Sequence, residues 1–190
     1  MTGLTAAAVM ALASSCNVAG VPLPRIVAAA EVESGFQALA IYDNTAERSF
    51  VPSSLAEAVA MADFLLRSGH RIDAGLMQVA STNWASLGLT LHSVFDPAAN
   101  ICAGARVLAE DYAIERRVSC RYNTGRPLCT NGYPERIQRA MASSATLQLA
   151  GATVARHPKH PPTSSQPKFA FVYDEPAGGG LEAIFVGGSP

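Results

Sequence analysis

The stretch LPRIVAAAEVESG, residues 23–35, predicts a short apolar helix that ends in two acids. Pro24 suits the first turn of a helix, where its missing N–H is not needed. Apolar residues follow at helical spacing, and Gly35 is a typical C-terminal stop. Glu31 and Glu33 therefore fall in the last turn, and either of them is a candidate for chemistry.

The helical wheel separates the two acids only slightly. Glu33 falls close to Ile26 on the wheel, whereas Glu31 falls farther around, and both flank the apolar face. The C-terminal end of a helix carries partial negative charge, which raises the pKa of an acid there and favours a proton donor near neutral pH. The alternative is that both are solvated acids at a helix end.

Further helices are predicted downstream. Their ranges are 53–69, which opens on a Ser54/Glu57 capping box, then about 83–87, a long helix from Asp96 and Pro97 through Tyr112, and about 134–149. The segment HRIDAGLMQVA, residues 70–80, is predicted as an ordered loop or short extended segment. No strand pattern of period two is found in the first 150 residues, so we expect a mainly helical, all-α fold.

The chain divides into three parts by composition. Residues 1–20 hold an apolar run that is either a signal-like segment or a first helix. Residues 16–150 are predicted to form one domain, and residues 151–190 a Pro- and Gly-rich tail that is mostly flexible. Within the tail, FAFVY at residues 169–173 is a candidate strand for binding a partner.

Composition limits the partners of the protein. The net charge is -1, and charged residues make up only 15% of the chain. That leaves no broad basic field for nucleic acid or an anionic membrane. No stretch has the length of a transmembrane helix. A neutral or mixed-charge polymer is the expected ligand.

The four cysteines, Cys16, Cys102, Cys120 and Cys129, contain no C-x-x-C pair. No His stands at zinc-finger spacing, so we expect no metal site. An even count is typical of disulfides in an oxidising compartment. Cys120 and Cys129 flank a turn-rich stretch and form one candidate pair, which leaves Cys16 with Cys102. Four buried thiols in a reducing compartment remain the alternative.

A series of short motifs recurs in a fixed order along the first three quarters of the chain. It consists of ESGF (33–36), AIYDN (40–44), DAGLMQV (73–79), NWASLG (83–88), FDPAANICAGARVL (95–108) and YNTG (122–125). This series resembles the lytic transglycosylases of the soluble-transglycosylase, goose-lysozyme-like superfamily, and most of all the small enzymes associated with type IV secretion and conjugation. The resemblance covers residues 16–142.

The resemblance implies a lysozyme-like helical domain that is a monomer, has a groove for peptidoglycan and uses no cofactor. Glu33 matches the sole catalytic carboxylate, and Ser34 matches a residue that orders the site. Glu31 has no catalytic counterpart. Peptidoglycan as substrate, together with the cysteines, implies export to the periplasm, and the tail is a candidate contact for secretion or conjugation proteins.

Four more residues match substrate-binding positions of the family. Met77 and Gln78 match groove residues beside the scissile bond, and Tyr122 and Asn123 match residues that hold the catalytic acid and the acetamido group of the substrate. Each also has a simpler interpretation: a core methionine, a loop amide, a half-buried aromatic and an ordinary turn asparagine.

The resemblance predicts cleavage of the β-1,4 bond between N-acetylmuramic acid and N-acetylglucosamine with formation of a 1,6-anhydro product. Asp73 is the main complication, because a second carboxylate near Gly75 would suit an inverting muramidase that uses water. Its other interpretation is structural, as an acceptor for loop amides. A non-catalytic wall-binding assembly factor is the third alternative.

Overall fold

The computed structural model describes residues 3–115, 122–123 and 131–150. The helices are α1 (Ala6–Ser15), α2 (Leu23–Ser34), α3 (Leu55–Arg67), α4 (Trp84–Leu87), α5 (Pro97–Glu115) and α7 (Tyr133–Ala150). Two short 3-10 helices cover Ser81–Asn83 and Ser93–Phe95. The mainly helical, lysozyme-like fold class is confirmed. The predicted tail, including FAFVY, lies outside the described residues.

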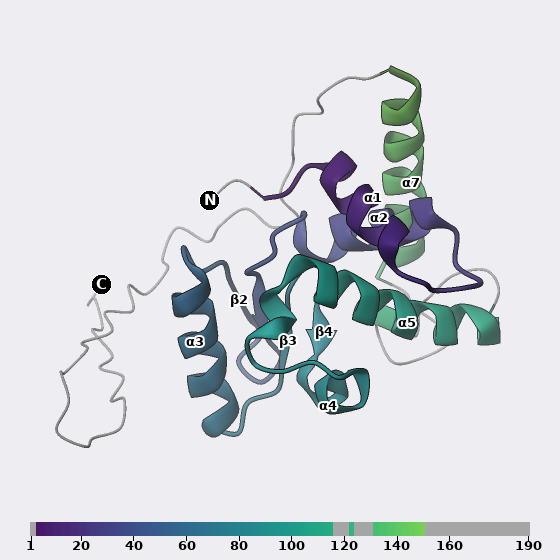
Figure 1. Ribbon diagram of the computed structural model, residues 1–190. Coiled ribbons are helices and arrows are strands. Elements are labelled where there is room, and N and C mark those ends of the chain that lie inside the picture. The colour runs from purple at the N-terminus through teal and green to yellow at the C-terminus, as the bar shows by residue number, and fades with distance from the viewer. Residues whose placement is uncertain (1–2, 116–121, 124–130, 151–190) are drawn as a thin grey trace, which may run out of the picture. The chain divides into compact units, whose positions relative to one another are not determined.

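Helix α2 forms the centre of the packing, in contact with α1, α5 and α7 (Figure 1). Residues 26–30 and Val32 are buried, and the three consecutive alanines among them leave room for the neighbouring helices. The helix ends as predicted at Gly35, which lies in the left-handed region with φ at 59°. The N–H of Gly35 donates a hydrogen bond to the carbonyl oxygen of Glu31. Glu33 is thereby placed on a well-anchored last turn.

Helix α3 begins at the predicted capping box. The hydroxyl of Ser54 accepts a hydrogen bond of 3.2 Å from the N–H of Glu57. The carboxylate of Glu57 accepts in return from the N–H and the hydroxyl of Ser53, both at 2.7 Å. These bonds lower the pKa of Glu57. The reciprocal bond therefore reaches one residue farther back than the usual pattern predicts.

The expectation of no strands is wrong. Four very short strands, β1 (Ile41–Asp43), β2 (Arg48–Phe50), β3 (Ile72–Ala74) and β4 (Val79–Ala80), form an antiparallel sheet in the order β2-β1-β3-β4. Segments of two or three residues are too short to display an alternating pattern, and backbone pairing alone defines them. The sheet brings Asp73 on β3 opposite Tyr42 on β1.

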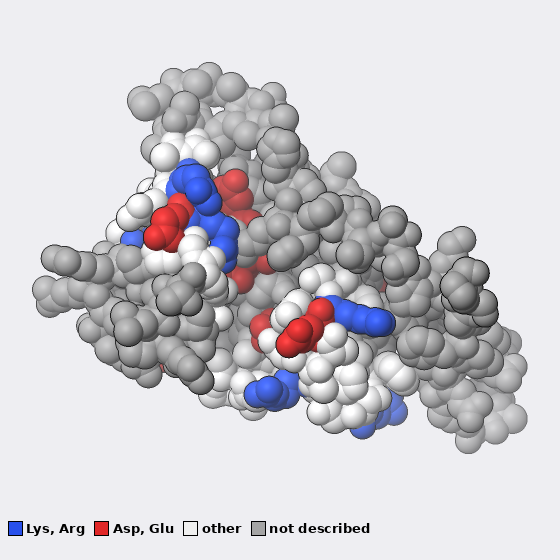
Figure 2. All heavy atoms as spheres, turned by 180° about the vertical axis from the view of Figure 1, so that it is seen from behind, with Lys and Arg blue, Asp and Glu red and all other residues white. Residues whose placement is uncertain are grey.

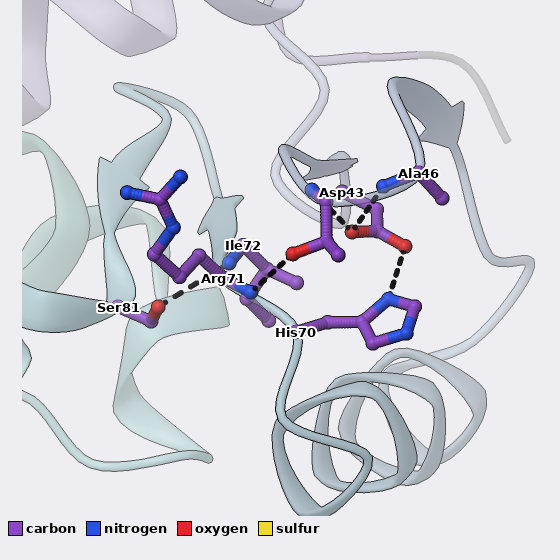
Figure 3. Close-up of polar contacts among 7 residues, drawn as sticks. Asp43, Ala46, His70, Arg71, Ile72 and Ser81 are labelled. Carbon is purple, nitrogen blue, oxygen red and sulfur yellow. Dashed lines mark hydrogen bonds and ion pairs between the residues drawn. The ribbon is translucent and has the colours of Figure 1, made fainter.

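The turn between β1 and β2 is fixed by a buried carboxylate (Figure 3). Asp43 is 1% exposed; its Oδ1 accepts from the N–H groups of Thr45 and Ala46 at 2.9 and 3.1 Å, and its Oδ2 lies 2.7 Å from Nδ1 of His70. Burial opposes the charge, but these bonds outweigh it and hold the pKa of Asp43 below its usual value. The turn is thereby tied to the end of α3.

The N-terminal helix α1 packs on α2 and α5, with Val9 and Ala13 buried. A disulfide joins Cys16, at its end, to Cys102 on α5 across 86 residues, which confirms that candidate pair. Cys120 and Cys129 lie outside the described residues. None of the helices within the described ranges combines the length and apolar character needed to cross a bilayer.

Charges are mixed on the face shown in Figure 2. Acidic and basic side chains of the described residues lie next to one another there. Arg67 and Asp63, one turn apart on α3, form such a pair. A mixed surface of this kind agrees with the net charge of -1.

Candidate active site

The last turn of α2 carries Glu33 and Ser34 into contact with the loop after β3. The hydroxyl of Ser34 donates to the carbonyl oxygen of Leu76 at 2.8 Å, and it also lies 3.1 Å from the carbonyl oxygen of Ala30. The first bond joins residues 42 positions apart. It therefore fixes the helix end that bears Glu33 against residues 75–78, called the 75–78 turn below.

Glu33 lies among groups whose pKa values its charge affects. Its Oε1 is buried. Burial first, and then the negative charge of Glu33, raise the pKa of Tyr122 and of Tyr133 well above the usual value. The same charge is one of the causes that raise the pKa of Asp73. Two phenols and a second carboxyl thus share the environment of Glu33.

Glu31 is half-buried, and burial raises its pKa too. The alternative of two solvated acids at the helix end therefore does not describe Glu31 fully, because its side chain is half-buried. A raised pKa at this helix end does not by itself single out a catalytic acid. What distinguishes Glu33 is its set of neighbours.

The 75–78 turn is built around a buried asparagine that the sequence did not single out. Asn100 on α5 is 0% exposed. Its Nδ2 donates to the carbonyl oxygens of Ala74 and Val94 at 3.0 and 2.8 Å, and its Oδ1 accepts from the N–H of Met77 at 2.7 Å. Gly75 has a φ of 81°, and a Cβ there would lie 2.2 Å from Nδ2 of Asn100. No other residue type fits at position 75 without displacing Asn100.

Gln78 has a left-handed backbone, with φ at 47°, which is uncommon for a residue other than glycine. Its Nε2 donates to the carbonyl oxygens of Ala40 and Gly75 at 3.1 and 2.8 Å. Because both partners are acceptors, the orientation of the amide is unambiguous. The two bonds use both Nε2 hydrogens, so Oε1 is the atom with which Gln78 can meet a ligand.

Met77 is 0% exposed, and its side chain packs on Gly104 of α5. A Cβ at position 104 would lie 2.3 Å from Cβ of Met77 and 2.9 Å from the hydroxyl of Tyr122. That hydroxyl donates a 2.6 Å bond to the carbonyl oxygen of Met77. The sequence-based contact of Met77 with a sugar stays a prediction, and Tyr122 is placed where it holds the 75–78 turn.

Asn123 is oriented by a second asparagine. Its Oδ1 accepts a 2.6 Å bond from Nδ2 of Asn131, whose own Oδ1 accepts from the N–H of Tyr133 at 3.2 Å. This chain assigns the Asn123 amide, because its oxygen faces a donor. The Oδ1 atom of Asn123 is thus engaged within the protein, and its Nδ2 group is the donor of this side chain. Its contact with a substrate stays a prediction. The remainder of the YNTG motif lies outside the described residues.

Asp73 is the second carboxyl of the region. Its pKa is raised from 3.8 to about 6, mainly by burial and in part by the charge of Glu33, whereas the Asn44 side chain and Arg71 act in the opposite direction. Asp73 also lines a hollow of about 200 Å³ together with Asn44, Arg71, Ile72, Ala80, Ser81 and Thr82. This cavity is called the Arg71 hollow below. The part of the chain that the structure describes contains no group of three metal-ligating side chains.

Sequence reasoning missed Asn100, Gly104 and Tyr133. A signal existed for the first two, because residues 100, 104 and 108 share the apolar face of α5, where a polar residue and a glycine stand out. Tyr133 begins α7 and carried no such signal. Its 0% exposure is a property of the packing alone.

The arrangement defines the class of protein. The model of the family described as "Transglycosylase SLT domain" matches residues 14–129, which is more than half of the chain, and the chain belongs to this family. The family consists of glycosidic-bond-cleaving enzymes. Its match spans Glu33, the 75–78 turn and the YNTG motif.

Two groups of relatives of this chain bear the name virB1. The chain is 32% identical over 127 residues to Protein virB1 of Agrobacterium fabrum, covering 60% of this chain and 52% of that protein. It is 30% identical over 152 residues to Type IV secretion system protein virB1 of Brucella abortus, covering 71% of this chain and 63% of that protein. The chain thus spans between half and two thirds of the length of these relatives. No solved structure gives a significant match.

Proposed function

We propose that the protein is a peptidoglycan lytic transglycosylase in which Glu33 acts as both acid and base. The observation that carries the proposal is the bond from Ser34 to Leu76, which joins the helix end bearing Glu33 to the 75–78 turn. Family membership supports the reaction class. The substrate is the glycan strand of peptidoglycan, cut between N-acetylmuramic acid and N-acetylglucosamine.

In the first step, protonated Glu33 gives its proton to the glycosidic oxygen. The bond from that oxygen to C1 of the muramic acid breaks, and N-acetylglucosamine leaves with the bonding electrons and the proton. The positive charge that develops at C1 is met by the acetamido carbonyl oxygen of the same sugar. A second protein carboxylate is unnecessary for this substrate-assisted step.

Two amides of the site suit the acetamido group. Oε1 of Gln78 is free to accept from the acetamido N–H, which makes the acetamido oxygen more nucleophilic. Oδ1 of Asn123 is held by Asn131, which leaves Nδ2 as the group that donates to an oxygen of the sugar. Fixed dipoles of this kind stabilise developing charge without having to reorganise.

In the second step, ionised Glu33 takes the proton from the hydroxyl at C6 of the muramic acid. The C6 oxygen attacks C1, the acetamido oxygen leaves, and a 1,6-anhydro ring closes. Glu33 is protonated again at the end of the cycle. Water is not consumed, so the products are a 1,6-anhydro end and a free N-acetylglucosamine end.

The biological setting follows from the relatives. A relative bears the name Type IV secretion system protein virB1, and we propose that this protein opens peptidoglycan locally for such a machine, working in the periplasm. The disulfide between Cys16 and Cys102 fits an oxidising compartment. The tail is the proposed contact for the secretion or conjugation proteins.

The product distinguishes the proposal from its alternatives. Purified protein is incubated with peptidoglycan, and the released muropeptides are weighed by mass spectrometry. Anhydro ends are expected. Reducing ends would instead identify a muramidase in which Asp73 activates water. Asp73 is the candidate base of that alternative, because the charge of Glu33 affects its pKa. The absence of any release would identify a wall-binding assembly factor.

The matched pair Glu33→Gln and Glu31→Gln tests the assignment of the acid. Both acids lie in the last turn of α2 and both changes preserve shape. We expect a loss of at least a hundredfold in kcat for Glu33→Gln, since general acid catalysis contributes about 10²–10⁴-fold. Glu31→Gln should stay within about twofold of the wild type, the size expected of a group that takes no part in proton transfer. The reverse result contradicts the assignment.

A further inference from the structure

The Arg71 hollow is lined mainly by polar residues of the sheet and its turns. Ile72, which is 0% exposed, and Ala80 are its two apolar lining residues. Asn44, Arg71, Asp73, Ser81 and Thr82 supply polar groups around it. Whole small-molecule ligands occupy pockets of about 300–1,000 Å³. At about 200 Å³, the hollow suits one branch of a larger ligand.

The geometry around the hollow is fixed by three hydrogen bonds from backbone N–H groups, and Figure 3 draws those of Arg71 and Ile72. The N–H of Arg71 donates to the hydroxyl of Thr45 at 3.0 Å, and the N–H of Asn44 donates to the carbonyl oxygen of Arg71 at 2.9 Å. Ser81 accepts from the N–H of Ile72 at 3.3 Å. The hollow is thus preformed by the β1–β2 turn and the start of β3.

The charges of the hollow are opposite in sign and not joined in an ion pair. Arg71 is exposed, and its guanidinium forms no salt bridge with any residue that the structure describes. Asp73 is near enough for Arg71 to lower its pKa. A guanidinium fork binds carboxylates in a bidentate manner, and a carboxylate accepts N–H donors.

We propose that the Arg71 hollow binds the peptide branch of peptidoglycan. Arg71 forms an ion pair with a carboxylate of the branch, and the carboxylate of Asp73 accepts a hydrogen bond from an amide N–H of the branch. This inference rests on the proposed function, because it takes peptidoglycan as the ligand. N-acetylated sugar rings are uncharged and give Arg71 no partner. The peptide branch carries both carboxylates and amide N–H groups, whereas the lactyl acid left when the branch is removed carries only a carboxylate.

The hollow is linked to the reaction through the chain itself. Asp73 lines the hollow and lies three residues before Leu76, whose carbonyl oxygen accepts from the hydroxyl of Ser34 beside Glu33. A branch held in the hollow would therefore bring the muramic acid that bears it toward the helix end that carries Glu33. Arg71 acts as a specificity residue, which selects muramic acid units with an intact branch.

The test compares three soluble oligomers of equal length. The first carries peptide branches, the second has had them removed by an amidase and retains lactyl carboxylates, and the third is an N-acetylglucosamine oligomer without carboxylates. Binding is measured by calorimetry with Glu33→Gln protein, in which turnover is suppressed. Arg71→Gln is then added to that background. The matched control is Arg48→Gln, which changes another exposed arginine that does not line the hollow.

We expect Arg71→Gln to weaken binding of the branched oligomer by about fivefold to tenfold, the range for one charge-assisted contact. Binding of the other two oligomers should stay within twofold, and Arg48→Gln should leave all three unchanged. In the active protein the same variant should raise KM for the branched oligomer and leave kcat unchanged.

Three results would overturn the inference: an unchanged affinity for the branched oligomer, an equal loss for the amidase-treated oligomer, or an equal loss in Arg48→Gln. The outcomes are separable from the proposed function. If anhydro products form but Arg71→Gln does not change the affinity for the branched oligomer, binding of the branch in the hollow is refuted and the proposed function is not. If the protein binds the branched oligomer selectively but cleaves no glycosidic bond, the proposed function is refuted and binding of the branch in the hollow is not.

Discussion

The hydroxyl of Tyr122 donates a 2.6 Å hydrogen bond to the carbonyl oxygen of Met77, across 45 residues of chain. It links the YNTG motif to the 75–78 turn through the backbone of a buried residue. Its first effect is therefore on structure, and substrate contact by Tyr122 is a separate question.

Tyr122→Phe removes the bond and retains the ring. We expect the free energy of unfolding to fall by about 1 kcal/mol, the usual net value of one hydrogen bond, as measured by urea unfolding. Tyr42→Phe is the control, because no bond of the Tyr42 hydroxyl to a described residue is present, and it should change stability by less than about 0.5 kcal/mol. Equal effects of the two variants would contradict the structural role.

Asn100→Ala should be among the most damaging single changes in the domain. It leaves the N–H of Met77 and the carbonyl oxygens of Ala74 and Val94 without their partner in a buried site. We expect a loss of about 2–4 kcal/mol, since each unsatisfied buried group costs about 1–3 kcal/mol and the site relaxes in part. Asn83→Ala, which removes no side-chain cap bond, should lie within about 0.5 kcal/mol of wild type.

The pKa of Asp73 predicts a pH dependence of stability. In the folded protein this pKa is about 6 against the usual 3.8. Between these pH values the folded state holds a proton that the unfolded state releases, so the Asp73 contribution to stability is present below about pH 4 and is lost as the pH rises through about 6.

Asp73→Asn removes this titration. From pH 4 to pH 7.5, the stability of the variant relative to the wild type should rise by about 1–2 kcal/mol, after a discount because the carboxyl is not fully buried. Thermal unfolding of both proteins across this range measures it. The contribution of Asp43, whose pKa is lowered, falls away below pH 3.8 and cancels in the comparison. A flat or falling difference would show that Asp73 is not desolvated.

The disulfide closes a long loop. Replacing both Cys16 and Cys102 by alanine should lower the free energy of unfolding by about 4 kcal/mol, because the bond spans 86 residues and its effect on the unfolded chain grows with loop length. Urea unfolding midpoints provide the measurement. Adding a reductant to the double variant then reports on Cys120 and Cys129 alone. If the free energy of unfolding falls by less than about 1 kcal/mol, the disulfide does not stabilise the protein by constraining the unfolded chain.

The sequence predicted those parts of the fold that depend on local chemistry. The Pro24 start and Gly35 stop of α2, the Ser54 cap of α3 and the Asp96 cap of α5 all act through neighbours within four residues, and the structure confirms them. The sheet could not be predicted in this way, because its strands are defined by pairing across the chain. The pairing of Cys16 with Cys102 also spans the chain, but it was a candidate because Cys120 and Cys129 are near neighbours in sequence, and the structure confirms it.

The candidate site was predictable in residue identity and not in geometry. Motif order brought out Glu33, Gln78 and Asn123. The orientation of both amides, by contrast, depends on contacts that the motifs do not predict. Asn131, which orients Asn123, lies outside every motif, and Gln78 is oriented by the backbone carbonyl oxygen of Ala40, whatever its side chain. Whether Met77 and Ser34 touch a sugar remains a prediction, since both are engaged within the protein.

The close approach of Gly104 to Met77 has a consequence for protein engineering. The missing side chain at position 104 is the space that the methionine fills, so the two positions behave as one packing unit of fixed combined volume. A library that enlarges residue 104 alone will push on the 75–78 turn and on Tyr122 together. Variants with altered groove shape are therefore best sought by exchanging bulk between the two positions.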